Sequence, residues 1–219
     1  MIIEATNYYA IVSQLPEDTE VIFHGATWDE YEELLDQVGE AAGLRISFNN
    51  GTLKVMSLSS EHEKYVRFIE GLIVAIKLRL HINIVSFGSA TMRKRRESKG
   101  NEPDACFYIQ TAAMIGNRIE LDFSIDPPPD IVVGVDIHHD STNNDAIYAA
   151  LGVPELWRYD EWAMTIYHLQ EDEYVVAETS RALPMLTSRT LTEYVERMRQ
   201  DGEFEALLAF DEWLQSLPR

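Results

Sequence analysis

The chain of 219 residues is poor in several features that mark particular classes of protein. Its single cysteine, Cys106, excludes an internal disulfide and suits a reducing compartment. No apolar run approaches the roughly 18 to 20 residues of a membrane span, and the run Leu72 to Ile76 ends at Lys77. The first ten residues carry Glu4 where a secretory signal would have positive charge. We therefore expect a cytoplasmic protein without a membrane segment.

Positive charge is also scarce, because 18 Lys and Arg stand against 37 Asp and Glu, which gives a formal net charge of -19. A chain this acidic is repelled by the phosphates of nucleic acids unless its basic residues cluster. Two interpretations of the densest cluster stay open: a solvated hairpin tip, or a loop that contacts DNA phosphates. The cluster consists of Arg93, Lys94, Arg95, Arg96 and Lys99.

Residues 129–137 form the most continuous apolar run bounded by turn residues, and we expect the fold to be organised around it. Valine and isoleucine at its odd positions predict a strand that is buried on at least that face. Alternation places Asp130, Val132, Gly134 and Asp136 on the other face. Two carboxylates on one face of a core strand are unfavourable unless they are hydrogen-bonded, paired or metal-bound.

Local signals predict the other elements. A capping box at Thr27 and Glu30 begins a helix that runs to about Val38. The pair Asn50-Gly51 supplies the positive φ angles of a tight hairpin turn over residues 44–57. Ser59 or Ser60 caps a long helix to about residue 80, and residues 1–20 are expected to be irregular. Further strands are predicted at 83–93 with a break near Gly88, 105–110, 155–159, 163–169 and 173–178, and helices at 145–151, 191–198 and 203–217.

Asp104 begins the strand at 105–110, and we expect the even-numbered face of residues 130–137 to come beside it. Carboxylates that converge from adjacent strands, with a lysine nearby, are what a divalent-metal phosphodiesterase needs, because hard oxygens hold Mg²⁺ and the metal activates water. Acidic residues at strand ends are common, however, so spacing alone leaves a structural role open.

Two residues in the first turn of the long helix have both a functional and a structural interpretation. His62 falls on the apolar side of the helix, where it is either a satisfied histidine at the edge of the core or a site residue. Glu63 is either a site carboxylate or the capping-box partner of Ser60.

Four stretches of the sequence are distinctive together: Ser-Glu-His-Glu at 60–63, Glu-Pro-Asp-Ala-Cys-Phe-Tyr-Ile at 102–109, Pro-Pro-Asp-Ile-Val-Val at 128–133, and residues 147–159. They resemble the Uma-two family of restriction endonucleases, within the PD-(D/E)XK nuclease superfamily. The resemblance covers roughly residues 27–169, and the run Ala-Leu-Gly-Val-Pro-Glu-Leu-Trp at 150–157 is its most specific part. It implies an α+β fold with a restriction-endonuclease-like central mixed sheet flanked by helices, and a Mg²⁺-dependent site that cleaves DNA.

The chain departs from the pattern of that family at two positions. Asp104 matches the first metal-binding aspartate, but Gly134 stands where the family has a glutamate and Asn144 where it has a lysine. Asp136, two residues along on the same face, could replace the missing carboxylate, with His138 and His139 as a base or ligand. The interpretation as an enzyme therefore takes Asp104, from the resemblance, and Asp136, from the shared strand face, as metal ligands, with Glu63 or His62 contributing from the helix.

Three functions remain open on the sequence. The chain is an active endonuclease with a migrated site, a nuclease fold whose catalysis is weakened or lost and which still docks on DNA or a partner, or a homodimer whose main role is association. The third depends on apolar residues in the acidic tail, which pack either on a second copy or on their own core. These residues are Phe204, Leu207, Leu208, Phe210, Trp213 and Leu214.

We predict an N-terminal arm at 1–26 ahead of a hairpin, a nuclease-like domain at 27–189 and a helical tail at 190–219.

Overall fold

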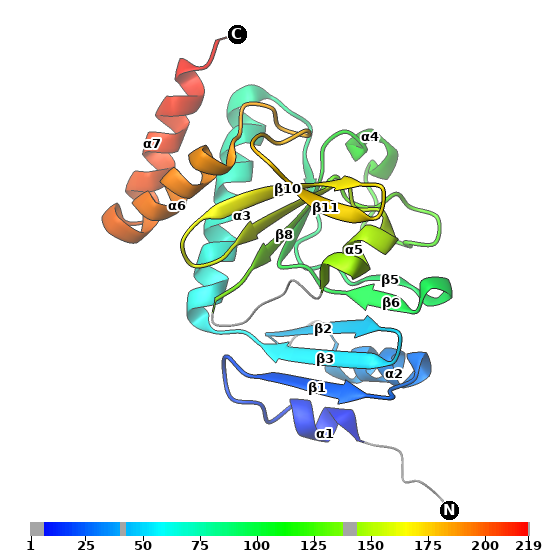
Figure 1. The fold of residues 1–219 in the computed structure, drawn as a ribbon. Helices are drawn as coiled ribbons and strands as arrows, with labels where there is room; N and C mark the ends of the chain where they lie inside the picture. The colour runs from blue at the N-terminus through cyan, green and yellow to red at the C-terminus, as the bar shows by residue number, and fades with distance from the viewer. Residues whose placement is uncertain (1–6, 40–42, 138–143, 219) are drawn as a thin grey trace, which may run out of the picture.

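A computed structural model describes residues 7–39, 43–137 and 144–218, and its ribbon shows two sheets flanked by helices (Figure 1). The first sheet has five strands in the order β1-β3-β2-β6-β5, and its neighbouring strands are antiparallel. These strands are β1 (Glu20–His24), β2 (Leu44–Asn49), β3 (Thr52–Ser57), β5 (Met92–Lys94) and β6 (Lys99–Asn101).

The second sheet has six strands in the order β11-β10-β9-β8-β7-β4. Its central pair β8 and β9 is parallel and the other pairs are antiparallel, so the sheet is mixed as expected. Helix α5 (Asp145–Leu151) lies in the connection between the two parallel strands. The strands are β4 (Val85–Ser86), β7 (Ala105–Tyr108), β8 (Ile131–Val135), β9 (Glu155–Tyr159), β10 (Met164–Gln170) and β11 (Glu173–Ala177).

Helices cover both faces of the second sheet. The odd-numbered residues of β8 pack in the main core with α3 (Ser60–Leu80), α6 (Ser188–Asp201) and α7 (Glu203–Ser216). Val132, on the other face, packs with α5 in a smaller core. The α+β class is therefore confirmed, and β8 is buried on both faces. The remaining helices are α1 (Tyr8–Val12), α2 (Trp28–Val38), α4 (Ala112–Ile115) and the 3-10 turn η1 (Arg95–Glu97).

The local signals are confirmed where their chemistry is specific. In the capping box, the Glu30 carboxylate accepts from the Thr27 N–H at 2.7 Å and the Thr27 hydroxyl accepts from the Glu30 N–H at 3.2 Å. Asn50 and Gly51 adopt φ of 48° and 89° in the β2–β3 turn. Ser59 caps α3 and accepts from the His62 N–H at 3.2 Å, so Glu63 does not complete a capping box with Ser60.

Two expectations about the elements are wrong. The strand expected at 83–93 does break near Gly88, but its two parts, β4 and β5, belong to different sheets instead of one strand. The N-terminal residues expected to be irregular include α1 and lead into β1, which forms the edge of the first sheet. The division at residues 26 and 189 stays a prediction. None of the described helices is both long and apolar enough to cross a bilayer.

Helix α2 packs very closely on the first sheet at one glycine. Tyr31 is fully buried, and its ring stacks on Phe48 of β2 with centroids 5.2 Å apart. A Cβ on Gly100 of β6 would lie 2.3 Å from the Tyr31 hydroxyl oxygen. The Tyr31 ring therefore occupies the space that a side chain at position 100 would need.

Candidate functional site

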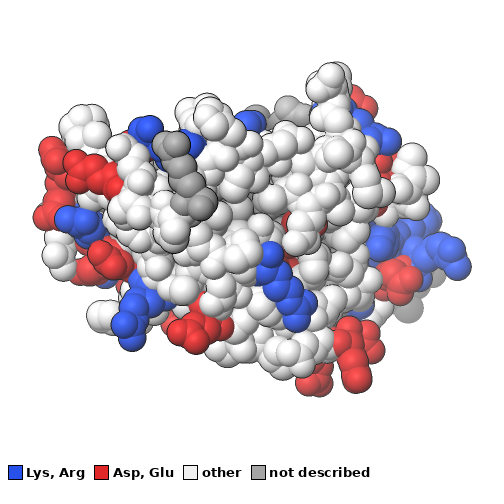
Figure 2. Space-filling model, turned by 90° about the horizontal axis from the view of Figure 1, so that it is seen from above, with Lys and Arg blue, Asp and Glu red and all other residues white. Residues whose placement is uncertain are grey.

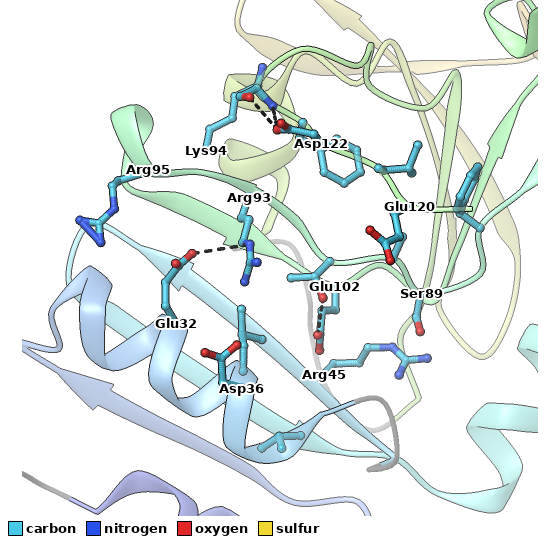
Figure 3. Close-up of a pocket in the computed structure, with 18 of the residues that line it drawn as sticks. Glu32, Asp36, Arg45, Ser89, Arg93, Lys94, Arg95, Glu102, Glu120 and Asp122 are labelled. Carbon is cyan, nitrogen blue, oxygen red and sulfur yellow. Dashed lines mark hydrogen bonds and ion pairs between the residues drawn. The ribbon is translucent and has the colours of Figure 1, made fainter. Parts of the chain in front are cut away.

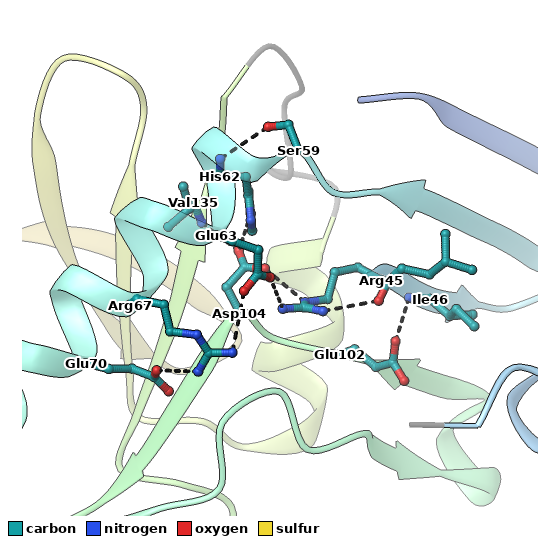
Figure 4. Close-up of polar contacts among 11 residues, drawn as sticks. Arg45, Ile46, Ser59, His62, Glu63, Arg67, Glu70, Glu102, Asp104 and Val135 are labelled. Atoms are coloured by element: carbon teal, nitrogen blue, oxygen red, sulfur yellow. Dashed lines mark hydrogen bonds and ion pairs between the residues drawn. The ribbon is translucent and has the colours of Figure 1, made fainter. Parts of the chain in front are cut away.

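Asp104 lies where the chain passes from β6 in the first sheet to β7 in the second (Figure 4). Its Oδ1 accepts from Arg45 Nε of β2 at 3.0 Å, and its Oδ2 accepts from the Val135 N–H of β8 at 2.8 Å. His62 Nε2 of α3 lies 3.3 Å from the same Oδ2. The expected approach of Asp104 to β8 is thus confirmed, and groups from three elements hold its carboxylate.

These neighbours stabilise the negative charge of the Asp104 carboxylate. Burial alone would raise its pKa, but the His62 imidazole, the Arg45 guanidinium and the Val135 N–H outweigh burial and hold the pKa below its usual value. Asp104 is therefore ionised over an extended range of acidic pH.

His62 and Glu63 both reach this carboxylate or its arginine. His62 is 4% exposed, and among the described residues neither of its ring nitrogens has a partner with hydrogen-bond geometry. Glu63 Oε1 lies 3.6 Å from Arg45 Nη2, and its Oε2 lies 3.5 Å from Arg67 Nη2. The predicted residues Asp104, His62 and Glu63 are thus brought together, with Arg45 between the two carboxylates.

Asp136 is held by a different arginine. Arg158 of β9 places its Nε 3.1 Å from Asp136 Oδ2, and its Nη2 contacts Asp145 at the start of α5. Burial would lower the pKa of Arg158, but the two carboxylates outweigh this and raise it. Gly134 of β8 lies opposite Arg158 of β9. On the other side of β8, Ala105 pairs with Val133, and the same register places Asp104 opposite Gly134. The two proposed metal ligands therefore flank Gly134, and each has a cation of the protein beside it.

Asp130, which directly precedes β8, has a structural role. Asp130 is 4% exposed, and its Oδ2 accepts from the Ile109 N–H, the Thr111 N–H and the Thr111 hydroxyl at 2.6, 3.0 and 3.0 Å. The unfavourable burial noted for the β8 carboxylates is thus offset by hydrogen bonds at Asp130 and by an ion pair at Asp136.

The basic cluster forms the hairpin β5–η1–β6, as expected for a hairpin tip. Four of its side chains have partners within the chain: Arg93 with Glu32 at 3.5 Å, Arg95 with Asp29, Lys94 Nζ with the Leu151 carbonyl at 3.2 Å, and Lys99 Nζ with Asn49 Oδ1 at 2.8 Å. The Arg95 and Arg96 side chains remain exposed at the tip. Two of the five basic side chains, Arg93 and Arg95, therefore pair with an acidic residue, while Lys94 and Lys99 donate to neutral oxygens.

A groove of about 1370 Å³ runs between α2, the hairpin and residues 119–124 (Figure 3). Its charges nearly cancel, so it is not a continuous basic track. On the face shown in Figure 2, Lys and Arg likewise form small groups with Asp and Glu beside them. The charged lining residues are the basic Arg45, Arg93, Lys94, Arg95 and Arg96 and the acidic Glu32, Asp36, Glu97, Glu102, Glu120 and Asp122.

Comparison with known proteins places the chain in a family. Residues 28–198 match the model of the family Uma2, described as "Putative restriction endonuclease". The chain belongs to the Uma2 family. A solved structure, a putative nuclease belonging to DUF820 from Anabaena variabilis ATCC 29413, is similar with 13% identity and a TM-score of 0.47, over 68% of this chain and 89% of that one. No curated protein matches.

Uma2 membership bears out the family resemblance and the restriction-endonuclease-like fold, and it implies a divalent metal. The described residues do not fit a divalent metal ion. Among residues 7–39, 43–137 and 144–218, no group of three His, Cys, Asp or Glu could hold an ion. Gly134 offers no ligand, and Asn144, at the N-cap of α5, is a neutral amide. His138 and His139, proposed as a base or ligand, lie outside the described residues.

Sequence reasoning missed the two arginines that define this Uma2 site. Arg45 lies in a hairpin strand 59 residues before Asp104, and nothing in its local pattern distinguishes it from a solvated strand residue. Arg158 lies in β9, within residues 147–159, where alternation would have placed it on the face of Gly134 once the parallel pairing was known. Glu102 was also missed: burial raises its pKa, although Thr91 and the Ile46 N–H donate to its carboxylate.

Proposed function

We propose that this Uma2 protein docks on DNA through a nuclease fold whose hydrolytic activity is weakened or lost. One observation carries the proposal: both carboxylates that would share a metal are paired with arginines, Asp104 with the half-buried Arg45 and Asp136 with the buried Arg158. A metal would compete with a guanidinium for each carboxylate, and Gly134 stands where the family pattern has a glutamate.

Weakened catalysis follows from the residues that are missing. Without a carboxylate at Gly134 the site loses a hard-oxygen ligand, and without a lysine at Asn144 it loses a cation that would stabilise the charge developing on a phosphate. Losses of this kind reduce turnover by roughly 10² to 10³ each when one charge-stabilising donor is removed.

A migrated active site is the second candidate. Here Asp104 and Asp136 remain the metal ligands for Mg²⁺, and His62 and Glu63 contribute from α3. The observation that favours it is the buried His62 imidazole, whose Nε2 lies 3.3 Å from Asp104 Oδ2. Arg45 and Arg158 would have to release the two carboxylates, and Asp136→Ala would then abolish Mg²⁺ or Mn²⁺ binding.

DNA docking is assigned to the exposed tip of the basic hairpin, at Arg95 and Arg96, which also line the groove of mixed charge beside it. The cytoplasmic location and the pairing of two copies expected from the sequence stay predictions beside this function.

The deciding experiment is cleavage of supercoiled plasmid in Mg²⁺ or Mn²⁺, with the wild type, Asp104→Ala, and the restored variant Gly134→Glu with Asn144→Lys. We expect no nicking by the wild type and measurable nicking by the restored variant. A third substitution, Asp104→Ala in the restored variant, is the matched control and should remove the gained activity.

Nicking by the wild type that disappears in Asp104→Ala would overturn the proposal in favour of the migrated site. Absence of DNA binding by the wild type in a gel-shift assay at low salt would overturn the docking role.

A further inference from the structure

Two neighbouring helices expose large apolar side chains on one surface. Val74 and Leu78 of α3 are 51% and 67% exposed, and Phe204 and Leu208 of α7 are 70% and 46% exposed. Singly exposed apolar residues are ordinary, but a group of them on adjacent elements is typical of an interaction site. We call these four residues the α3–α7 surface.

The two helices that carry these four residues pack side by side. A Cβ on Gly71 of α3 would lie 3.3 Å from Leu207 Cδ2 of α7. Further along, the Arg79 guanidinium binds both carboxylate oxygens of Asp211 at 2.7 and 2.6 Å. The residue numbers increase on both helices from the first contact to the second, so α3 and α7 run in the same direction, as Figure 1 shows.

Helix α7 has more apolar surface than its own fold uses. Ala206, Phe210 and Leu214 form the stripe buried in the main core. Phe204 and Leu208, spaced four residues apart, form a second stripe that faces solvent. The tail therefore covers its own core with one stripe and leaves another uncovered.

The charges at the two edges of the surface are opposite. Lys77 is exposed on the α3 side, next to Val74 and Leu78. Glu212 is exposed on the α7 side, one turn beyond Leu208. Across its length α7 carries four acidic residues and no basic one. The surface is thus apolar in the middle, positive at one edge and negative at the other.

We propose that the α3–α7 surface binds a second copy of this chain. A two-fold axis that runs between the helices, parallel to them, places α3 of one copy on α7 of the other. The apolar stripes then meet, and Lys77 of each copy faces the Glu212 edge of its partner. This self-complementary charge pattern is the reason for choosing a second copy as the occupant.

Sedimentation velocity over a concentration series tests the pairing. We expect the wild type to associate as concentration rises and the variant Leu78→Glu with Phe204→Glu to stay monomeric. The matched control is Ile119→Glu with Ile125→Glu, which adds the same charge at apolar residues 90% and 78% exposed elsewhere. A wild type that is monomeric throughout, or a control that dissociates equally, would overturn the proposal.

A charge exchange tests the geometry without removing apolar area. Lys77→Glu or Glu212→Lys alone should each weaken association by placing like charges at the edges, and the two together in one chain should restore it. Additive weakening in the double variant would overturn the two-fold arrangement. Unchanged far-ultraviolet circular dichroism verifies that each variant is folded.

Discussion

At the scale of single residues, the stretch from Glu102 to Asp104 holds two carboxylates whose pKa values shift in opposite directions. Burial raises the pKa of Glu102 because its hydrogen bonds from Thr91 and Ile46 do not compensate for lost hydration. Cations and a backbone N–H lower the pKa of Asp104 despite equal or deeper burial. Two acids separated by the single residue Pro103 therefore have pKa values shifted in opposite directions.

The folded pKa of Asp104 lies below its unfolded value of about 3.9. Its stabilising contribution is therefore present above that value and is lost as pH falls through the folded pKa. We expect Asp104→Asn to lower the free energy of unfolding at pH 7 by about 3 kcal/mol, because the half-buried Arg45 loses its nearest counter-charge.

Urea unfolding of wild type and Asp104→Asn along a pH series measures this. The difference in unfolding free energy should shrink as pH falls into the acid range. Glu102→Gln is the contrasting control, because a raised pKa makes stability fall as pH rises through it. A constant difference between wild type and Asp104→Asn would contradict the account.

Gly100 provides a second test at a single position. Gly100→Ala should destabilise the protein by about 1 to 3 kcal/mol through overpacking, because its Cβ would lie 2.3 Å from the Tyr31 hydroxyl oxygen. Tyr31→Phe removes that oxygen and should recover part of the loss. Gly71→Ala is the control: its Cβ meets only the flexible end of Leu207, and alanine favours helix by up to about 1 kcal/mol. Thermal melts that fall equally for both alanine variants would contradict the steric argument.

At the scale of elements, Arg158 joins three of them. Its guanidinium connects β9 to Asp136 after β8 and to Asp145 at the start of α5. Because β8 and β9 are parallel, their connection has to cross over, and this ion pair fixes where the crossover helix begins.

We expect Arg158→Met to destabilise by about 3 to 5 kcal/mol, since it leaves two carboxylates without their buried cation. Arg158→Lys should recover only part of the loss, because a single ammonium cannot replace separate guanidinium nitrogens. Denaturant unfolding checks this against Arg197→Met, whose side chain is 43% exposed and pairs with Asp201 at 3.8 Å. Equal effects of the two methionine variants would contradict a buried clamp.

The elements could be predicted where their signals are local. The capping box, the Asn-Gly turn and the period of β8 depend on neighbours a few residues away, and all three are confirmed. The split of residues 83–93 between two sheets could not be predicted, because no local pattern states which partner a strand edge will find. Arg45 at Asp104 was missed for the same reason, since the pairing spans 59 residues.

At the scale of the whole molecule, DNA affinity has to overcome a net charge of -19. Exposed phosphate contacts release counterions, so the affinity should fall as salt rises. Arg95→Ala and Arg96→Ala should each reduce the slope of log affinity against log salt by about 1. Fluorescence anisotropy measures the slope, with Arg197→Ala on α6 as control. A slope unchanged by the hairpin variants would show that DNA binds elsewhere.

The path of the chain between the two sheets has a consequence for synthesis. Strands β1, β2 and β3 are complete by Ser57, but the free edge of β2 is covered only when β6, at Lys99–Asn101, pairs with it. During translation that edge is a bare row of hydrogen-bonding groups while α3 and β4 are still being made. A nascent chain that stalls between Ser57 and Lys99 is therefore the species of this protein most prone to aggregate, and chaperones would meet it there first.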